Sequence, residues 1–139
     1  MLGRIKTSNR PLQGPVAFGI SQTEFDERVS VISIEGELDL LTAPRLKWVL
    51  LDALTAGQDR LVVDLSLATF MDSTALGVLL GVERTLGLDA CLAIVCTAPN
   101  VLKIFEIAGL DGVFAIFPTL DGALAYAQGH ERLGDRGAS

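Results

Sequence analysis

The sequence predicts a single α/β domain with a mixed β-sheet and about four helices. First, the chain has 139 residues, of which 50% are hydrophobic and 20% charged, and this is enough apolar material for one buried core. Second, short apolar runs typical of strands alternate with segments that carry apolar residues at helical spacing. Such alternation is typical of a sheet whose strands are joined by helical crossovers.

The first two predicted elements form a β-hairpin. Strand-like runs cover residues 18–24 and 28–35, and the second run is rich in β-branched side chains. Asp26 and Glu27 lie at the turn between them. Residues 36–41 are expected to form a connector to the first helix.

The first helix is predicted to begin at Thr42 and to end at Gly57. Thr42 is a candidate N-cap, and Pro44 falls in the first turn, where its missing N–H does no harm. One face carries apolar residues at helical spacing, which we assign to the core: Leu46, Leu50, Ala53 and Leu54. Trp48 and Leu51 lie off this face. Either they expose an apolar patch for a partner or a second copy, or Trp48 covers a sheet edge.

The rest of the chain alternates between buried strands and helices, and the complete predicted order is β-β-α-β-α-β-α-β-α. The strands are short continuous apolar runs, as expected for positions covered on both faces of a sheet. They are predicted at residues 61–65, 90–96 and 113–117. The helices, located by capping residues and terminal glycines, are predicted at residues 72–86, 99–108 and 119–128.

Two pairs of small residues have a structural interpretation. Gly77 and Gly81 lie four residues apart on one face of the second helix, where each glycine lowers helix stability. We therefore expect another backbone to approach closely there. Cys91 and Cys96 lie five residues apart in a strand, and this odd offset directs them to opposite faces. They are expected to be buried, with neither a disulfide nor a shared metal site between them.

The ends of the chain differ from its centre. Residues 1–15 are expected to form a flexible N-terminal arm, residues 16–129 the folded domain, and residues 130–139 a flexible C-terminal tail. The sequence shows neither a signal-peptide pattern nor an apolar run of membrane length, so we expect a cytoplasmic protein without membrane insertion. Its net charge of −6, without a basic stripe, argues against direct nucleic-acid binding.

The stretch from Leu65 to Gly81, LSLATFMDSTALGVLLG, carries the candidate site. Asp72, Ser73 and Thr74 open the second helix, and such side chains accept hydrogen bonds from the unpaired N–H groups of a helix start. One interpretation is therefore a well-capped helix. The other is a phosphorylation site, because free N–H groups and the positive end of the helix dipole favour an anion at this place.

Two motifs resemble one known family. FMDSTALGVLLG resembles the phosphorylation-site motif F-M-D-S-[ST]-G-L-G-x-[LIV] of anti-sigma factor antagonists in the STAS family. The sequence GELD at residues 36–39, followed by TAP at residues 42–44 and by Leu46, resembles the G-E-L-D-x-x-T-A-x-x-L segment of the same family. Both motifs occur in the right order, and the resemblance extends over residues 18–127. It implies a STAS-like mixed sheet with helices.

The resemblance also implies a function as a switch. The unphosphorylated protein would bind an anti-sigma factor, itself a serine kinase of the histidine-kinase-like ATPase fold, and so free a sigma factor. The kinase would phosphorylate Ser73 and the complex would separate, until a PP2C-type phosphatase restores the active form. Only the family pattern selects Ser73 over Thr74. No catalytic residue, cofactor or metal is implied in the chain itself.

The resemblance assigns partner binding to the residues around the two motifs. These are Glu37, Asp39, Met71, Asp72, Ser73, Thr74 and Ala75. Asp39 matches the family's acidic residue beside the phosphorylation site, and with Glu37 and Asp72 it would make this surface strongly negative. The chain departs from the family at Ala75, where glycine is usual. The extra methyl group is a candidate for stiffening the helix start and for crowding a partner or the kinase.

Three other functions compete with this one. A hydrolase with Ser73 as nucleophile lacks the G-x-S-x-G pattern, and the single histidine, His130, falls in the tail. A receiver domain with Asp64 as phosphoacceptor at a strand end lacks both the acid pair after the first strand and the lysine after the last. A STAS domain that is not phosphorylated, serving as a scaffold or as an accessory subunit of a transporter, shares the fold. The oligomeric state stays open.

Overall fold

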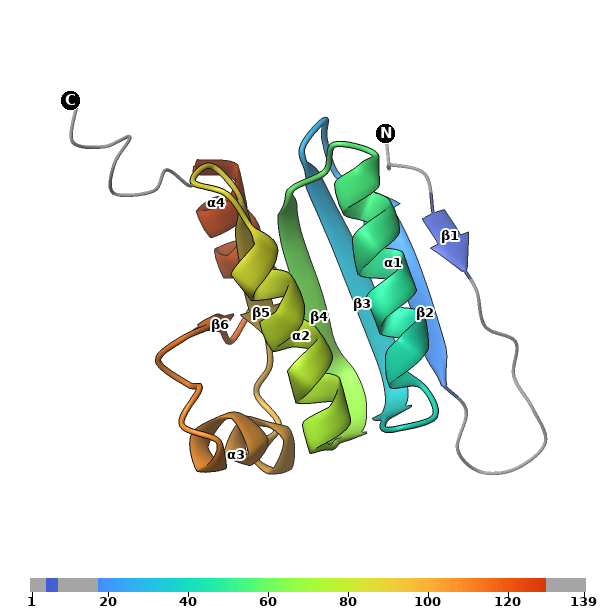
Figure 1. The fold of residues 1–139 in the computed structure, drawn as a ribbon. Helices are drawn as coiled ribbons and strands as arrows, with labels where there is room; N and C mark the ends of the chain where they lie inside the picture. Colours follow the sequence, from blue (N-terminus) through green and yellow to red (C-terminus); the bar gives the residue numbers. More distant parts are fainter. Residues whose placement is uncertain (1–4, 8–17, 130–139) are drawn as a thin grey trace.

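In the residues that the structure describes, 5–7 and 18–129, six strands lie side by side in the order in which the chain makes them (Figure 1). In this computed structural model the strands are β1 (Ile5–Thr7), β2 (Gly19–Glu24), β3 (Val29–Leu38), β4 (Arg60–Met71), β5 (Cys91–Val95) and β6 (Ala115–Phe117). The first three pair antiparallel, and β3 to β6 pair parallel. The predicted mixed sheet and its hairpin are confirmed.

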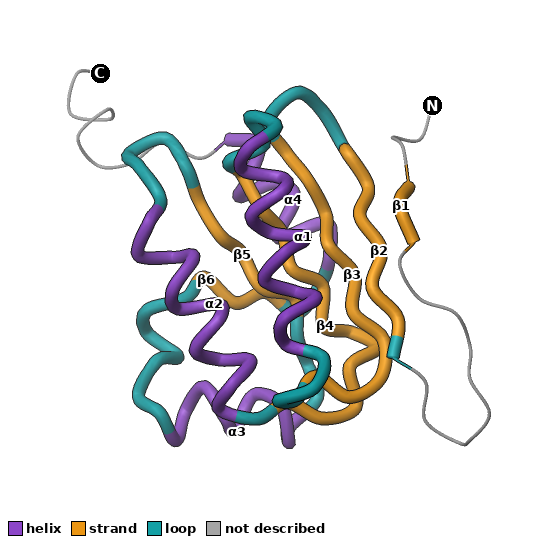
Figure 2. The backbone as a smooth tube through the Cα atoms, turned by 45° about the vertical axis from the view of Figure 1, so that its right-hand side comes forward, coloured by secondary structure: helices purple, strands orange, loops and turns teal. Residues whose placement is uncertain are grey.

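Four helices of the described residues cover the two faces of this sheet (Figures 1 and 2). They are α1 (Ala43–Thr55), α2 (Ser73–Thr85), α3 (Pro99–Ile107) and α4 (Leu120–Gly129). The three parallel crossovers all proceed in one direction along the sheet, and right-handed connections then place α1, α2 and α3 on the same face. Helix α4 follows the last strand and packs on the opposite face, against β4 and β5.

The central strands are buried on both faces, which explains their continuous apolar sequences. Val63 and Cys96 belong to the larger apolar cluster under α1, α2 and α3. Val62 and Cys91 belong to the smaller cluster under α4. The two cysteines therefore face opposite sides as predicted, both are buried, and no disulfide joins them. Burial also raises the pKa of the Cys96 thiol.

Strands β3 and β4 are longer than the sequence analysis predicted. Residues 36–38, expected to belong to a connector, continue β3, and residues 66–71 continue β4 beyond the predicted end. The pairing between the two strands shifts register on both sides of residues 35–36. Gly36 has a φ of +94°, a conformation that other residues rarely adopt and that suits a bulge within a strand. Gly36 therefore lies within an irregular part of β3 and does not end the strand.

Helix α1 begins and ends where it was predicted to. Its N-cap is Thr42, and Gly57 follows its end with a φ of +89°. The predicted core face is confirmed: Leu46, Leu50 and Ala53 are buried, and Leu54 is partly buried against the core. Trp48 is 65% exposed and therefore does not cover a sheet edge.

The first strand was not predicted. Ile5 and Thr7 pair with Thr23 and Ser21 of β2, so at least this part of the expected flexible arm adds a strand to the sheet. Three residues are too few for a periodic pattern to show in the sequence. The remaining residues of the arm and the tail at residues 130–139 lie outside the described residues.

The interpretation of Gly77 and Gly81 as packing positions is wrong. Both are exposed on α2, and a Cβ atom built on either would meet nothing within 4 Å. Their cost to helix stability is therefore not offset by close backbone packing in the structure.

We accordingly predict that Gly77→Ala and Gly81→Ala each raise the free energy of unfolding, by about 0.5–1 kcal/mol, because alanine is the better helix former and has room here. Urea denaturation measures the change. Gly57→Ala is the matched control: its Cβ also has open space, but a φ of +89° strains any residue other than glycine, so it should destabilise the protein. Destabilisation by Gly77→Ala or Gly81→Ala would contradict this account of the helix.

Candidate functional site

The candidate site lies where β3 and β4 end side by side. The two strands are parallel, so their carboxyl ends meet at one edge of the sheet, and Leu38 pairs in register with Met71. The pairing continues one residue further, because the backbone N–H of Asp72 donates to the carbonyl oxygen of Leu38 over 3.2 Å. This arrangement brings the β3–α1 loop against the first turn of α2.

The carboxylate of Asp72 joins these two segments. Its Oδ1 atom accepts hydrogen bonds from the N–H groups of Thr74 at 2.9 Å and Ala75 at 3.1 Å, which confirms the predicted helix cap. Its Oδ2 atom accepts a hydrogen bond from the N–H of Leu40 at 3.1 Å. One side chain thus fixes both the helix start and the position of the loop. It also takes two of the N–H groups that the sequence analysis expected to be free for an anion.

The β3–α1 loop is held by its own polar groups as well. Asp39 Oδ1 accepts from the N–H groups of Leu41 at 2.9 Å and Thr42 at 3.2 Å. The Thr42 hydroxyl accepts from the N–H of Asp39 at 2.8 Å and donates to the carbonyl oxygen of Glu37 at 2.9 Å. Thr42 occupies the N-cap position but makes no capping hydrogen bond to α1, because its hydroxyl is used inside the loop.

Ser73 is the first residue of α2, and its side chain is exposed. Within the described residues its hydroxyl has no hydrogen-bond partner, so it is accessible to a modifying enzyme. Thr74 is exposed in the same turn. Accessibility therefore does not separate the two hydroxyl groups, and the choice between them still depends on the family pattern.

Two of the expected partner-binding residues point inward. Met71 is 1% exposed and Ala75 is fully buried, and both belong to the core cluster beneath α1 and α2. The expectation that the Ala75 methyl group crowds a partner is therefore wrong, since that methyl packs in the core. Both residues pack in the core beneath the site and do not contribute to its exposed surface.

Glu37 is separated from the other acidic residues. It precedes the buried Leu38 on β3 and pairs in register with Phe70. Because side chains alternate along a strand, that of Glu37 points to the face of the sheet opposite α1 and α2. The structure thus brings Asp39, Asp72 and Ser73 together and leaves the Glu37 side chain on the other side.

Two exposed leucines of the site escaped the sequence analysis. Leu40 is 66% exposed and Leu41 is 83% exposed, and they lie in the loop that Asp72 holds. Large apolar side chains at such exposure are typical of contact surfaces when they adjoin a polar site. The sequence held one indication of this surface, namely two consecutive leucines in a segment that was expected to be a connector.

The structure also bears on the rival functions. Asp64 lies within β4 and not at a strand end, and its carboxylate accepts hydrogen bonds from the N–H and the hydroxyl of Ser66, each at 2.9 Å or less. This placement does not suit a receiver phosphoacceptor. His130 lies outside the described residues. Residues 5–7 and 18–129 contain neither a group of three metal-ligating side chains nor a helix long and apolar enough to span a membrane.

Comparison with known proteins agrees with the fold and with the two motifs. A family model described as the STAS domain matches residues 21–123. A Mycobacterium tuberculosis protein named anti-sigma-F factor antagonist RsfB is 32% identical over 101 residues, which cover 73% of this chain and 83% of that protein. A Staphylococcus aureus protein named anti-sigma-B factor antagonist is 32% identical over 96 residues, covering 68% of this chain and 89% of that protein.

A solved structure gives the same result in three dimensions. The crystal structure of an anti-sigma factor antagonist from Mycobacterium paratuberculosis matches with a TM-score of 0.76 and 32% identity. The match covers 84% of this chain and 99% of that one. The resemblance that the two motifs suggested is thereby confirmed over most of the fold. The chain belongs to the STAS domain family and, within it, to the anti-sigma factor antagonists.

Proposed function

We propose that this protein works by partner switching. Its unphosphorylated form binds an anti-sigma factor that is itself a serine kinase, and this binding releases a sigma factor. Phosphorylation of Ser73 by that kinase ends the binding, and a PP2C-type phosphatase restores it. The chain performs no catalytic step of its own, and we expect it in the cytoplasm, where sigma factors act. The observation that carries the proposal is the exposed Ser73 hydroxyl beside the carboxylate that fixes the loop.

The proposed contact region, here named the switch surface, consists of residues 39–41 and 72–74. Leu40 and Leu41 offer exposed apolar area, which binding would remove from water. Asp39 and Asp72 add negative charge, and their hydrogen bonds hold both carboxylates in place. Such a surface suits a partner that presents basic side chains around an apolar centre.

Phosphorylation would change this surface through charge. A phosphoserine carries about −1.5 to −2 charges at neutral pH. At residue 73 this charge adjoins Asp72, whose Oδ1 atom already uses the N–H groups of Thr74 and Ala75. The phosphate therefore competes with the cap and repels its carboxylate, which weakens the hold on Leu40. The core under the site is apolar and buried, so the fold persists while the binding surface changes.

The alternative is a STAS domain that is not phosphorylated and serves as a scaffold or transporter subunit. It would share the fold and the capped helix. The relatives at 32% identity are named anti-sigma factor antagonists, and this supports partner switching. A phosphorylation assay with the partner distinguishes the two functions, because only partner switching requires that the partner phosphorylates this protein.

We predict that the anti-sigma factor kinase from the same genome, given ATP, adds a single phosphate to the wild-type protein. Intact-mass and peptide mass spectrometry should map it to Ser73. Ser73→Ala should receive none, and the matched variant Thr74→Ala should still be phosphorylated. In calorimetric titrations Ser73→Asp should bind the kinase about tenfold more weakly than Ser73→Ala, because it places a charge in the interface.

One outcome would overturn this proposal, and a second would change the residue at which it acts. If the kinase phosphorylates a control substrate but not this protein, the proposal of partner switching fails and the scaffold alternative is favoured. A phosphate that maps to Thr74 would leave the switch standing but at the wrong residue.

The dual role of Asp72 makes a second prediction. Asp72→Ala removes the cap and should lower the free energy of unfolding by about 1 kcal/mol. Asp72→Asn can keep the cap through its carbonyl oxygen, so it should cost less, but its NH₂ group cannot accept the hydrogen bond from Leu40. Both variants should therefore bind the kinase more weakly, as measured by calorimetry alongside urea denaturation. If Asp72→Asn binds like the wild type, the loop tether has no role in recognition.

A further inference from the structure

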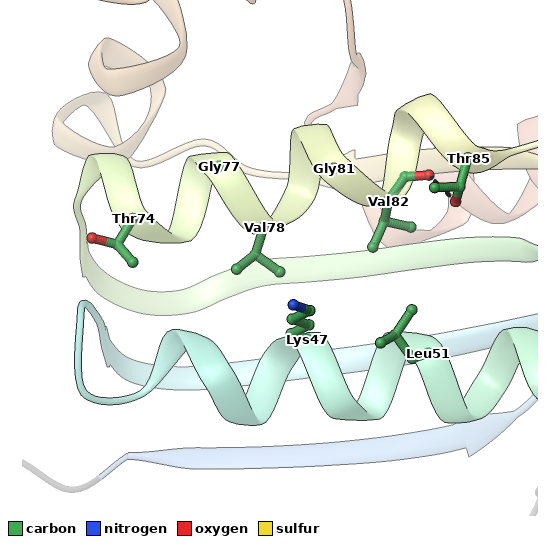
Figure 3. Close-up of a pocket in the computed structure, with 8 residues that line it drawn as sticks. All are labelled: Lys47, Leu51, Thr74, Gly77, Val78, Gly81, Val82 and Thr85. Atoms are coloured by element: carbon green, nitrogen blue, oxygen red, sulfur yellow. Dashed lines mark hydrogen bonds between the residues drawn. The ribbon is translucent and has the colours of Figure 1, made fainter.

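A groove separates α1 from α2 on the face of the protein that carries the switch surface (Figure 3). Its volume is about 450 Å³. Lys47 and Leu51 of α1 line one side, and Thr74, Val78 and Gly81 of α2 lie among the residues of the other. A second hollow of about 420 Å³ continues across α1 to Trp48 and Leu40. Trp48 is 65% exposed, and neither the fold nor the switch surface gives this side chain a role.

The shape of the groove follows from its glycines. Gly77 and Gly81 lie on successive turns of α2, and no atom occupies the space where their Cβ atoms would lie. Larger side chains there would fill the groove and make a more stable helix. The observed residues instead leave the backbone of α2 accessible to a molecule that lies along it.

Lys47 gives the groove its charge. Its side chain projects from α1 toward α2 in the direction of Val78 (Figure 3). Within the described part of the chain it forms no ion pair, although the protein carries a net charge of −6. An exposed cation between apolar walls is complementary to a carboxylate that is flanked by apolar groups.

We propose that this groove binds an amphipathic helix of the anti-sigma factor, with apolar side chains against Leu51 and Val78 and a carboxylate on Lys47. The inference rests on the proposed function and adds a second contact to it. Continuity supports this occupant, because Thr74 lines the groove and also belongs to the switch surface. An added strand would need an open sheet edge to pair with, and two helices do not offer one. An amphipathic helix binds a groove through its side chains, so it fits this groove better.

The test compares groove variants in titrations with the kinase that phosphorylates Ser73. Gly81→Leu fills the groove, whereas Gly81→Ala adds one methyl group, and both favour the helix, so unfolding does not explain a loss of binding. We expect Gly81→Leu to weaken binding about tenfold and Gly81→Ala to change it less than about twofold. Lys47→Glu should weaken binding about tenfold, while Arg84→Glu, the same charge reversal on α2 outside the groove lining, should have little effect.

The outcomes separate this inference from the proposed function. If the wild type binds and is phosphorylated but Gly81→Leu and Lys47→Glu bind equally well, the groove inference fails and partner switching stands. If the wild type neither binds nor is phosphorylated, both fail. Sedimentation of the protein alone tests the other occupant: a wild-type dimer that Gly81→Leu converts to a monomer would show that a second copy fills the groove, and this would overturn the assignment to the anti-sigma factor.

Discussion

The carboxylate of Asp72 is the interaction on which the site depends. One oxygen caps α2 and the other holds the N–H of Leu40 in the β3–α1 loop, so two segments far apart in the sequence share a single anchor. The sheet makes this possible, because the parallel pairing of β3 and β4 ends with Leu38 opposite Met71 and delivers both chain segments to the same edge. A side chain in that position is sensitive to any charge placed beside it, and Ser73 is its immediate neighbour. Asp72 is therefore the residue on which the helix start, the position of the loop and the proposed regulation all depend.

The division between rigid and changeable parts follows from burial. The side chains directly beneath the site, Met71 and Ala75, are packed in the core, while Leu40, Leu41 and Ser73 are exposed. Charge added at the surface can alter the hydrogen bonds of the loop without opening the apolar cluster. Under the proposed function, this separation would let the protein lose its partner and keep its fold. The groove between α1 and α2 is likewise separate from the core, because Gly77 and Gly81 leave open space on α2 that no core side chain fills.

Much of the fold was predictable from local signals. Thr42 and the glycine after α1 marked the two ends of that helix, and Asp72 marked the start of α2. The apolar runs located the central strands. Gly36 misled because a glycine that permits a bulge and one that ends a strand look alike in sequence. The motif marked Ser73 as the candidate phosphorylation site. It did not indicate the hydrogen bond between Leu40 and Asp72, because that bond joins residues 32 positions apart. Nor did sequence show that the Ala75 methyl is buried or that Gly77 lines open space, because both depend on what packs against α2.

The most direct test of the central claim is the hydrogen-exchange rate of the Leu40 amide, measured by NMR before and after phosphorylation of Ser73. This amide donates its hydrogen bond to the Asp72 carboxylate, so it reports the tether itself. Our account predicts that phosphorylation speeds its exchange, while amides of the buried strand β5 exchange as before. Unchanged exchange at Leu40 in fully phosphorylated protein would contradict the claim that the switch acts through Asp72.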